Sequence, residues 1–265
     1  MTSDLAVVMD VAGTMLRMYR VAKDISSGVI MKQVVTWELI MEKSGRALVV
    51  PQMDPDIISS LRPDDPLAAV IHGCEHLVEV SCSSSNVSKE RALEILGGSS
   101  AKVRDLQEVH QAVVSRCPEK YRTAGMIVDD SRDEVAFTLS TGGVPFPGFQ
   151  DVLLELKQMS AEVYVASGDS MRSLSFLEEL GIDPHRIYPV CSPKMKKRVV
   201  SDLKGRYRRV AMVGDGLNDI YALQAADIGI LTVQQDTHPA PRLRGAADVV
   251  ISDIKELPDM VKLYL

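Results

Sequence analysis

The second half of the chain alternates between short apolar runs and longer segments with helical spacing of apolar residues. Short apolar runs bounded by turn residues predict buried strands. Strands that alternate with amphipathic helices predict a parallel sheet with helices on both faces. Residues 5–10 form a further apolar run and predict another strand of this sheet. The predicted strands lie at 163–167, 209–213, 228–231 and 248–251, and the predicted helices at 149–159, 171–180, 195–204 and 218–226.

A different pattern separates residues 5–10 from this region. Residues from Leu16 to Pro51 alternate as in strands, with one apolar face formed by Val29, Met31, Val35 and Trp37. Short helices are expected to start at Asp54-Pro55 and Asp65-Pro66. Longer helices are expected from Ser88 to Gly97-Gly98 and from Ser100 to Cys117-Pro118. Residues 126–137 predict a hairpin. We therefore expect an α/β protein with a three-layer, Rossmann-like core made from residues 1–20 and 125–265, and an inserted mixed α/β cap domain at 21–124.

Composition narrows the class of protein. The 265 residues are 46% hydrophobic and carry a net charge of −6, which argues against nucleic-acid binding, since that depends on neutralising phosphates. No apolar run approaches the ~18 residues of a membrane span, and the N-terminus carries no secretory signal. The four cysteines form no CxxC pair, so free thiols and a cytoplasmic location are expected. The oligomeric state is not predicted.

Three of the predicted strands end in acids or hydroxyl groups. Residues 5–10 end in Asp10, residues 163–166 precede Ser167, and residues 209–213 precede Asp215 and Asp219. The carboxyl ends of parallel strands share one edge of the sheet, where ligands bind in α/β folds. Two carboxylates around a glycine turn suit a hard, oxygen-seeking cation such as Mg²⁺. The sequence thus predicts a metal-dependent site at this edge.

In order and spacing, these segments resemble the motifs of the haloacid dehalogenase superfamily of phosphotransferases. The resemblance implies that Asp10 is the nucleophile and that Ser167 binds the transferring phosphoryl group. The third-motif lysine corresponds to Lys196, three residues after Pro193, although Lys194 and Lys197 are adjacent and leave the choice open. The implied Mg²⁺ ligands are Asp10, the backbone carbonyl of Ala12, Asp215 and Asp219, and the further implied phosphate-binding residues are Thr14, Gly168 and Asn218.

Within this superfamily the chain is most similar to the phosphorylation domain of P-type ATPases. The similarity lies in Ser167-Gly168-Asp169, in residues 214–219 and in the run Ala225-Ala226-Asp227-Ile228-Gly229-Ile230. The first motif, however, lacks the Lys and Thr that those pumps place between the nucleophile and Gly-Thr. Because no apolar run is long enough to span a membrane, we expect a soluble relative of this domain and not a pump.

Ala12 is the departure with the largest chemical consequence. Phosphatases of the superfamily place a second Asp there, which protonates the leaving group and later activates water. General acid–base catalysis contributes about 10²–10⁴-fold, so ordinary alkyl phosphates should be poor substrates. We expect a Mg²⁺-dependent phosphohydrolase that acts on a small phosphorylated metabolite through an aspartyl phosphate on Asp10.

Two alternatives remain open. Because of Ala12, the protein could bind phosphate and regulate a partner with little turnover. The DxAGT pattern also resembles phosphonoacetaldehyde hydrolases, which use a cap lysine as a Schiff base; Lys23, Lys32 and Lys43 are available. His72 and His76 are interpreted as part of a surface segment. Arg17 and Arg20 follow the nucleophile strand and are candidates for contacting an anionic leaving group.

Overall fold

The computed structural model describes residues 4–117, 121–235 and 238–263. The chain divides into two compact units, one formed by Met1–Met18 with Val144–Leu265 and the other by Tyr19–Gly143. We call them the core unit and the inserted unit. Among the described helices, none combines the length and the apolar character needed to cross a membrane.

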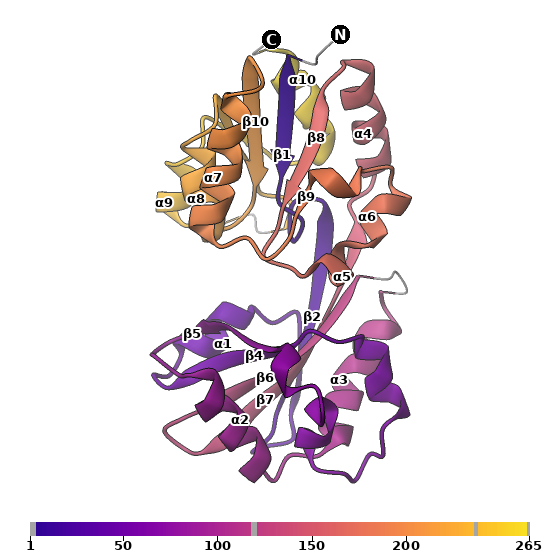
Figure 1. The fold of residues 1–265 in the computed structure, drawn as a ribbon, viewed down its shortest axis with the longest axis vertical. Coiled ribbons are helices and arrows are strands. Elements are labelled where there is room, and N and C mark those ends of the chain that lie inside the picture. The colour runs from indigo at the N-terminus through magenta and orange to yellow at the C-terminus, as the bar shows by residue number, and fades with distance from the viewer. Residues whose placement is uncertain (1–3, 118–120, 236–237, 264–265) are drawn as a thin grey trace. The chain divides into compact units, whose positions relative to one another are not determined.

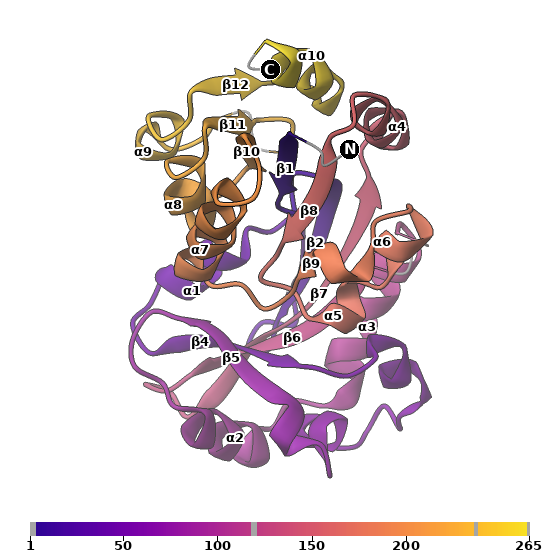
Figure 2. The ribbon, with the colours of Figure 1, turned by 45° about the horizontal axis from the view of Figure 1, so that its top comes forward.

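The core unit is built on a six-stranded parallel sheet in the order β12-β11-β10-β1-β8-β9 (Figures 1 and 2). Every residue of β1 is buried, as expected for an apolar strand flanked on both sides. Met9 at the end of β1 pairs with Val213 on one side and Val165 on the other. The residues that follow these three strands are therefore neighbours. The strands are β1 (Leu5–Met9), β8 (Glu162–Ala166), β9 (Ile187–Tyr188), β10 (Arg209–Gly214), β11 (Ile228–Thr232) and β12 (Val249–Ile251).

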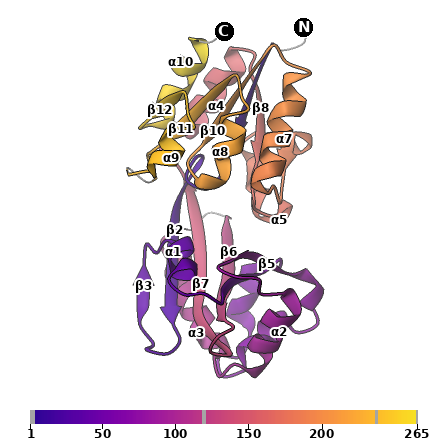
Figure 3. The same cartoon turned by 90° about the vertical axis from the view of Figure 1, so that its left-hand side faces the viewer.

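Helices cover both faces of this sheet (Figures 1 and 3). One face packs against the apolar sides of α7, α8 and α9, and the helices α4 and α10 contact each other on the opposite face. The helices are α4 (Phe149–Gln158), α5 (Met171–Leu174), α6 (Phe176–Glu179), α7 (Pro193–Lys204), α8 (Ile220–Leu223), α9 (Pro241–Arg244) and α10 (Leu257–Lys262), with 3₁₀ turns η4 (Pro184–Arg186), η5 (Leu217–Asp219) and η6 (Ile254–Glu256).

The inserted unit holds a six-stranded sheet in the order β3-β2-β7-β6-β4-β5, with antiparallel strand pairs (Figure 3). Its strands are β2 (Leu16–Asp24), which begins in the core unit, β3 (Ile30–Lys32), β4 (Arg46–Pro51), β5 (Val78–Ser83), β6 (Arg122–Asp129) and β7 (Glu134–Pro145). Its helices are α1 (Thr36–Met41), α2 (Lys89–Gly98) and α3 (Val103–Val114), with 3₁₀ turns η1 (Pro55–Ser60), η2 (Leu67–Ile71) and η3 (Glu75–Leu77).

Successive side chains of β7 contact different helices of the inserted unit, α1 and α3. Phe137 and Leu139 pack in an apolar cluster with Ile40 of α1. Thr138 and Ser140 point to the other face, where Thr138 Oγ1 donates to a carbonyl of α3 and Ser140 approaches His110 of that helix. Successive side chains of a strand point to opposite faces, so α1 and α3 lie on opposite faces of the sheet.

The predicted fold class is confirmed, and most predicted elements of the core are present. The inserted unit ends at residue 143 and not at 124, because the predicted hairpin forms β6 and β7 of its sheet. Val35 and Trp37 do not continue a strand: Val35 precedes α1, and Trp37 lies in it. Ser88 caps α2 as predicted, whereas α3 begins at Val103 instead of Ser100. The predicted helix 171–180 is two short helices, α5 and α6.

Candidate functional site

Asp10 follows β1 at the carboxyl edge of the core sheet. Its backbone N–H donates to the carbonyl of Val213 on β10 at 2.9 Å, and the residue is 4% exposed. The chain then turns tightly: the N–H groups of Thr14, Met15 and Leu16 all point to the carbonyl of Val11. Asp10 is thus held on a rigid strand end, next to the end of β10.

Gly13 makes this turn compatible with the neighbouring acid. Its φ is +79°, a left-handed conformation that glycine adopts without steric cost. A Cβ atom at this position would lie 1.8 Å from Oδ2 of Asp215. Only the missing side chain of Gly13 lets the Asp215 carboxylate sit against the turn.

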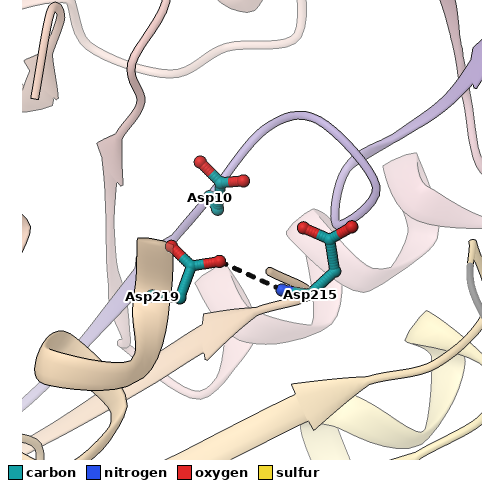
Figure 4. Close-up of side chains that lie close together, drawn as sticks. All are labelled: Asp10, Asp215 and Asp219. Carbon is teal, nitrogen blue, oxygen red and sulfur yellow. Dashed lines mark hydrogen bonds between the residues drawn. The ribbon is translucent and has the colours of Figure 1, made fainter. Parts of the chain in front are cut away.

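Three carboxylates meet at this edge (Figure 4). Asp10, Asp215 and Asp219 each offer an oxygen atom, and these oxygens all lie within 4.8 Å of one another. Asp10 comes from β1, and the other two come from the loop and 3₁₀ turn that follow β10. Three carboxylates supply the hard oxygen ligands that Mg²⁺ prefers, and Gly13 leaves room for one of them, Asp215. No softer ligand belongs to this group of residues.

Asp219 is engaged through both of its oxygens. Oδ2 accepts hydrogen bonds from the backbone N–H groups of Asp215 (3.2 Å) and Gly216 (3.1 Å). Oδ1 accepts a hydrogen bond from Nζ of Lys196 at 2.7 Å. Asp219 is fully buried, so these contacts compensate its desolvation. It fixes both the turn that presents Asp215 and the position of the lysine.

Lys196 ties the nucleophile to this turn. Its Nζ lies 2.6 Å from Oδ1 of Asp10 as well as 2.7 Å from Asp219, and the side chain is fully buried. Burial alone would lower the pKa of the Lys196 ammonium, but the charges of Asp10 and Asp219 outweigh it and hold that pKa above its ordinary value. Burial raises the pKa of Asp10 to about 7; Lys196 opposes this shift and Asp219 adds to it.

The choice among the three lysines follows from helix geometry. Lys196 lies on the buried face of α7 with Val199, Val200 and Leu203, at i, i+3, i+4 and i+7, while Lys194 and Lys197 are exposed. This apolar spacing is visible in the sequence and is typical of the buried face of a helix. It is the signal that distinguishes Lys196 from its two neighbours.

Ser167 follows β8, beside Asp10. It is 1% exposed, and its backbone is fixed by hydrogen bonds to Tyr188 and Cys191. Its hydroxyl donates to Oδ2 of Asp169 at 2.8 Å. The sequence motifs assign Asp169 no role in the site, although it lies only two residues beyond the predicted phosphate-binding hydroxyl.

The remaining predicted residues occupy varied positions. Thr14 is buried, and its hydroxyl has no hydrogen-bond partner among the described residues. Gly168 and Asn218 are exposed and Ala12 is half-buried, all in the core unit. Arg17 stacks on the ring of Phe146. In sequence, Ala12, Thr14 and Arg17 follow Asp10. Gly168 follows Ser167, and Asn218 precedes Asp219. The contacts of these residues with a ligand stay predictions.

The candidates of the inserted unit form no comparable site. Lys23 donates to Asp105 (2.8 Å) and Glu108 (2.7 Å), while Lys32 and Lys43 are exposed and Arg20 is half-buried. His72 and His76 are exposed, as the surface interpretation predicts. In the part of the chain that the structure describes, Asp10, Asp215 and Asp219 are the only group of three His, Cys, Asp or Glu side chains whose ligand atoms lie close enough to share a metal ion.

Comparisons with known proteins identify the family of the chain. The family model described as haloacid dehalogenase-like hydrolase matches residues 5–227. A protein of Methanocaldococcus jannaschii named soluble P-type ATPase-like phosphatase is 28% identical over 260 residues, which cover 97% of this chain and 93% of that protein. A copper-exporting P-type ATPase of Legionella pneumophila is 42% identical over 81 residues, 30% of this chain and 11% of the pump.

The chain also matches a solved structure of a zinc-transporting PIB-type ATPase in its E2.Pi state. The matched region covers 98% of this chain and 41% of the ATPase chain. The TM-score is 0.50 at 17% identity, which indicates a shared fold and nothing about activity.

Proposed function

Since the chain belongs to the haloacid dehalogenase-like hydrolase family, we propose that it is a Mg²⁺-dependent phosphohydrolase that acts on a small phosphorylated molecule through Asp10. The family match confirms the prediction of a hydrolase, and the relatives confirm the resemblance to P-type ATPases. One observation carries the proposal: a buried lysine binds the candidate nucleophile and Asp219 at once, beside a third carboxylate. No CxxC pair occurs among the four cysteines, and we place the protein in a reducing compartment, the cytoplasm.

Each residue of the site has a definite task in this reaction. Asp10 attacks phosphorus with a carboxylate oxygen, which forms an aspartyl phosphate and releases the leaving group. Lys196 holds that carboxylate in place and neutralises negative charge as it spreads over the phosphoryl oxygens. Ser167 donates its hydroxyl to an equatorial oxygen. Water then attacks the aspartyl phosphate and regenerates Asp10.

The residues that would hold Mg²⁺ are Asp10, Asp215 and the backbone carbonyl of Ala12, with Asp219 oriented toward the same point. When bound, the ion would offset the charge of the phosphoryl group against the charge of the nucleophile. Asp219 has less freedom than Asp215, because backbone N–H groups and Lys196 engage both of its oxygens. We assign it chiefly to positioning the turn.

Trapping the intermediate tests the proposal. The protein would be incubated with Mg²⁺ and acetyl phosphate, quenched with acid, and measured as an intact mass. We expect a phosphoryl adduct on the wild type and none on Asp10→Asn, with the modified residue identified by peptide mass spectrometry. If neither adduct nor turnover appears over a panel of phosphorylated metabolites, the result favours the alternative of a phosphate-binding or regulatory protein with little turnover, for which Ala12 is the reason.

Ala12 provides a second test. Ala12→Asp introduces the acid–base group that phosphatases of the superfamily carry, at a position that is half-buried. Hydrolysis of p-nitrophenyl phosphate should rise, by up to about 10²-fold, the lower end of what acid–base catalysis contributes. The rate is followed by nitrophenolate absorbance under Mg²⁺ saturation. An unchanged or lower rate in a folded variant would show that position 12 does not limit turnover.

The Schiff-base alternative is not supported by the inserted unit. Burial lowers the pKa of the Lys23 ammonium, but its hydrogen bonds to Asp105 and Glu108 outweigh burial and hold the pKa above its ordinary value. A Schiff base requires a neutral amine. Lys23 is therefore poorly suited to that chemistry.

A further inference from the structure

The turn that follows the nucleophile is closed by hydrogen bonds among residues 11–16. Gly13 N donates to the carbonyl of Leu16 at 2.8 Å, and the carbonyl of Val11 accepts from the three N–H groups already described. No residue that the structure describes donates a hydrogen bond to the carbonyl of Ala12. That oxygen is left available, which agrees with its proposed place among the metal ligands.

Two later carbonyls of this turn are held by other segments of the core unit. The carbonyl of Met15 accepts from the backbone N–H of Phe146 at 3.0 Å. The carbonyl of Thr14 accepts from Nε2 of Gln234 at 3.2 Å, and Gln234 lies in the loop that follows β11. A single side chain therefore connects this loop to the nucleophile turn.

Both ends of the Gln234 amide are engaged. While Nε2 donates to Thr14, Oε1 accepts from the backbone N–H of Ile254 at 3.1 Å. Ile254 is fully buried at the start of η6, which packs against α4. An amide has a donor end and an acceptor end, so the two partners determine which way it points. Gln234 thus bridges a buried anchor and the turn.

The bridged turn carries two features of the metal site. The carbonyl of Ala12 is a proposed ligand, and Gly13 leaves room for the carboxylate of Asp215, since a Cβ atom there would lie 1.8 Å from Oδ2 of Asp215. Thr14 follows both residues directly, and rigid peptide planes link the three. A shift of the Thr14 carbonyl therefore moves the Ala12 carbonyl and the Gly13 turn with it.

We propose that Gln234 is a positioning residue of the metal site, whose amide keeps the nucleophile turn in place against Asp215. In this role Gln234 contacts neither the metal nor the substrate and acts through the backbone of Thr14. The proposal rests on the proposed function, because it concerns the Mg²⁺ ion that this function requires. Groups that orient metal ligands contribute about 10–100-fold to metal affinity. Since Gln234 acts through the backbone, its contribution should lie at the lower end.

The same substitution at two adjacent glutamines tests this role. Gln234→Glu keeps the acceptor for Ile254 but loses the donor to Thr14, and it places a carboxylate oxygen against a carbonyl oxygen. Gln235→Glu is the matched control, because Oε1 of Gln235 accepts from Met18 N at 2.7 Å and a carboxylate accepts equally well. Each variant adds one negative charge, and charge alone would favour Mg²⁺ binding in both.

Isothermal titration calorimetry with Mg²⁺ alone measures the affinity. The Kd of Gln234→Glu should rise about tenfold, whereas Gln235→Glu should bind Mg²⁺ no more weakly than the wild type. The Mg²⁺ dependence of adduct formation from acetyl phosphate is the second readout. The Mg²⁺ concentration for half-maximal rate should rise in Gln234→Glu, while the rate at saturating Mg²⁺ stays close to that of the wild type.

Two results would overturn the role of Gln234. One is an unchanged Mg²⁺ affinity in Gln234→Glu, with or without a loss of stability in urea, since a purely structural residue would affect unfolding alone. The other is an equal loss of affinity in Gln234→Glu and Gln235→Glu. Gln234→Met removes both hydrogen bonds without adding charge, and it should also weaken Mg²⁺ binding. It replaces Gln234→Glu in the comparison if that variant does not fold.

Failure of the proposed function is visible in the wild type alone. If the wild type binds no Mg²⁺ and gains no adduct that Asp10→Asn abolishes, the metal-dependent reaction is overturned together with the role of Gln234. If the wild type binds Mg²⁺ and forms the adduct while Gln234→Glu behaves identically, only the role of Gln234 is lost.

Discussion

Each unit of this protein contains a cluster of charged and hydroxyl side chains with the residue types of an active site, and the two clusters differ in what surrounds them. The core cluster is formed by Asp10, Ser167, Lys196, Asp215 and Asp219 at the ends of parallel strands. The insert cluster is formed by Asp56, His110, Arg122 and Ser140 on the face of an antiparallel sheet. His110 Nδ1 lies 3.4 Å from Ser140 Oγ, and His110 Nε2 lies 3.3 Å from Asp56 Oδ1. A serine, a histidine and an aspartate linked in this order resemble a catalytic triad.

The resemblance to a triad ends at the serine. Ser140 is fully buried in the middle of β7, and its hydroxyl donates to the carbonyl of Thr123 at 3.1 Å. Arg122 holds Asp56 with two hydrogen bonds. In the insert cluster, these residue types thus form a hydrogen-bonded network on the face of a sheet. In the core cluster, similar residue types lie at strand ends and converge on a point where a ligand can bind. Position relative to the sheet, more than composition, distinguishes a site from a structural network.

Removing the lysine of the core cluster should have the largest effect. Lys196→Met leaves Asp10 and Asp219 buried without their cation, which costs about 3–5 kcal/mol of unfolding free energy. It also removes the charge opposite the phosphoryl group, so turnover should fall at least about 10²–10³-fold. The unfolding free energy and the turnover rate are measured for Lys196→Met and for the neighbouring Lys197→Met as control. Because Lys197 is exposed, its substitution should change stability by less than about 0.5 kcal/mol. Equal effects of the two variants would remove Lys196 from the site.

One serine from each cluster can be compared by the same substitution. Ser167 and Ser140 are both almost fully buried. Ser167→Ala removes a donor to the phosphoryl group and should lower kcat about 10²–10³-fold. Ser140→Ala loses its hydrogen bond to Thr123, at about 0.5–1.5 kcal/mol of stability, and should leave kcat unchanged. Steady-state kinetics and urea unfolding of both variants measure this; a large loss of kcat in Ser140→Ala would show that the insert cluster takes part in catalysis.

Two glycines provide a smaller and more local test of the metal cluster. Gly13 and Gly28 both have positive φ, +79° and +71°, so alanine strains the backbone at either position by about 1–2 kcal/mol. A Cβ atom at Gly13 would collide with Asp215, whereas one at Gly28 meets nothing within 4 Å. Gly13→Ala should therefore weaken Mg²⁺ binding about 10–100-fold and Gly28→Ala should not. Isothermal titration calorimetry measures both affinities, and equal affinities would contradict a metal at Asp215.

Much of the core unit could be predicted from sequence, because its strands are buried on both faces and form apolar runs. The residues that follow those runs are Asp10, Ser167, Asp215 and Asp219, so their placement at one sheet edge was predictable as well. Lys196 was ambiguous among three lysines because motif spacing alone does not tell the buried face of α7 from its exposed face. The hydrogen bond between Ser167 and Asp169 was not predicted, because sequence spacing does not reveal side-chain contacts.

The inserted unit was harder to predict because its elements depend on tertiary contacts. Apolar alternation around Val35 and Trp37 suggested a strand, but the segment 36–41 is a helix whose residue Ile40 packs on Phe137 and Leu139 of the sheet. Packing overrides a weak local pattern in such short segments. The insert cluster joins η1, α3 and the sheet, and residues so far apart in sequence give no motif.

The smallest predicted effect concerns the pH dependence of the insert cluster. Burial lowers the pKa of His110 below its ordinary value of 6.5; the charges of Asp56 and Asp54 oppose this shift and Arg122 adds to it. The unfolded chain therefore binds a proton near pH 6 that the folded chain does not, and stability should fall as the pH drops below about 6.5. Hydrogen bonds from Arg122 lower the pKa of Asp56, so its contribution is lost only at more acidic pH, below its ordinary value of 3.8.

His110→Gln isolates the contribution of the histidine. Its stability relative to the wild type is measured by urea unfolding at about pH 7.5 and about pH 5.5, on either side of the ordinary histidine pKa. Fluorescence of Trp37, the single tryptophan, reports on the inserted unit in which His110 lies. Glutamine does not titrate, so the variant should lose less stability than the wild type on acidification, whatever the absolute cost of the substitution. Parallel losses in both proteins would mean that folding leaves the protonation of His110 unchanged.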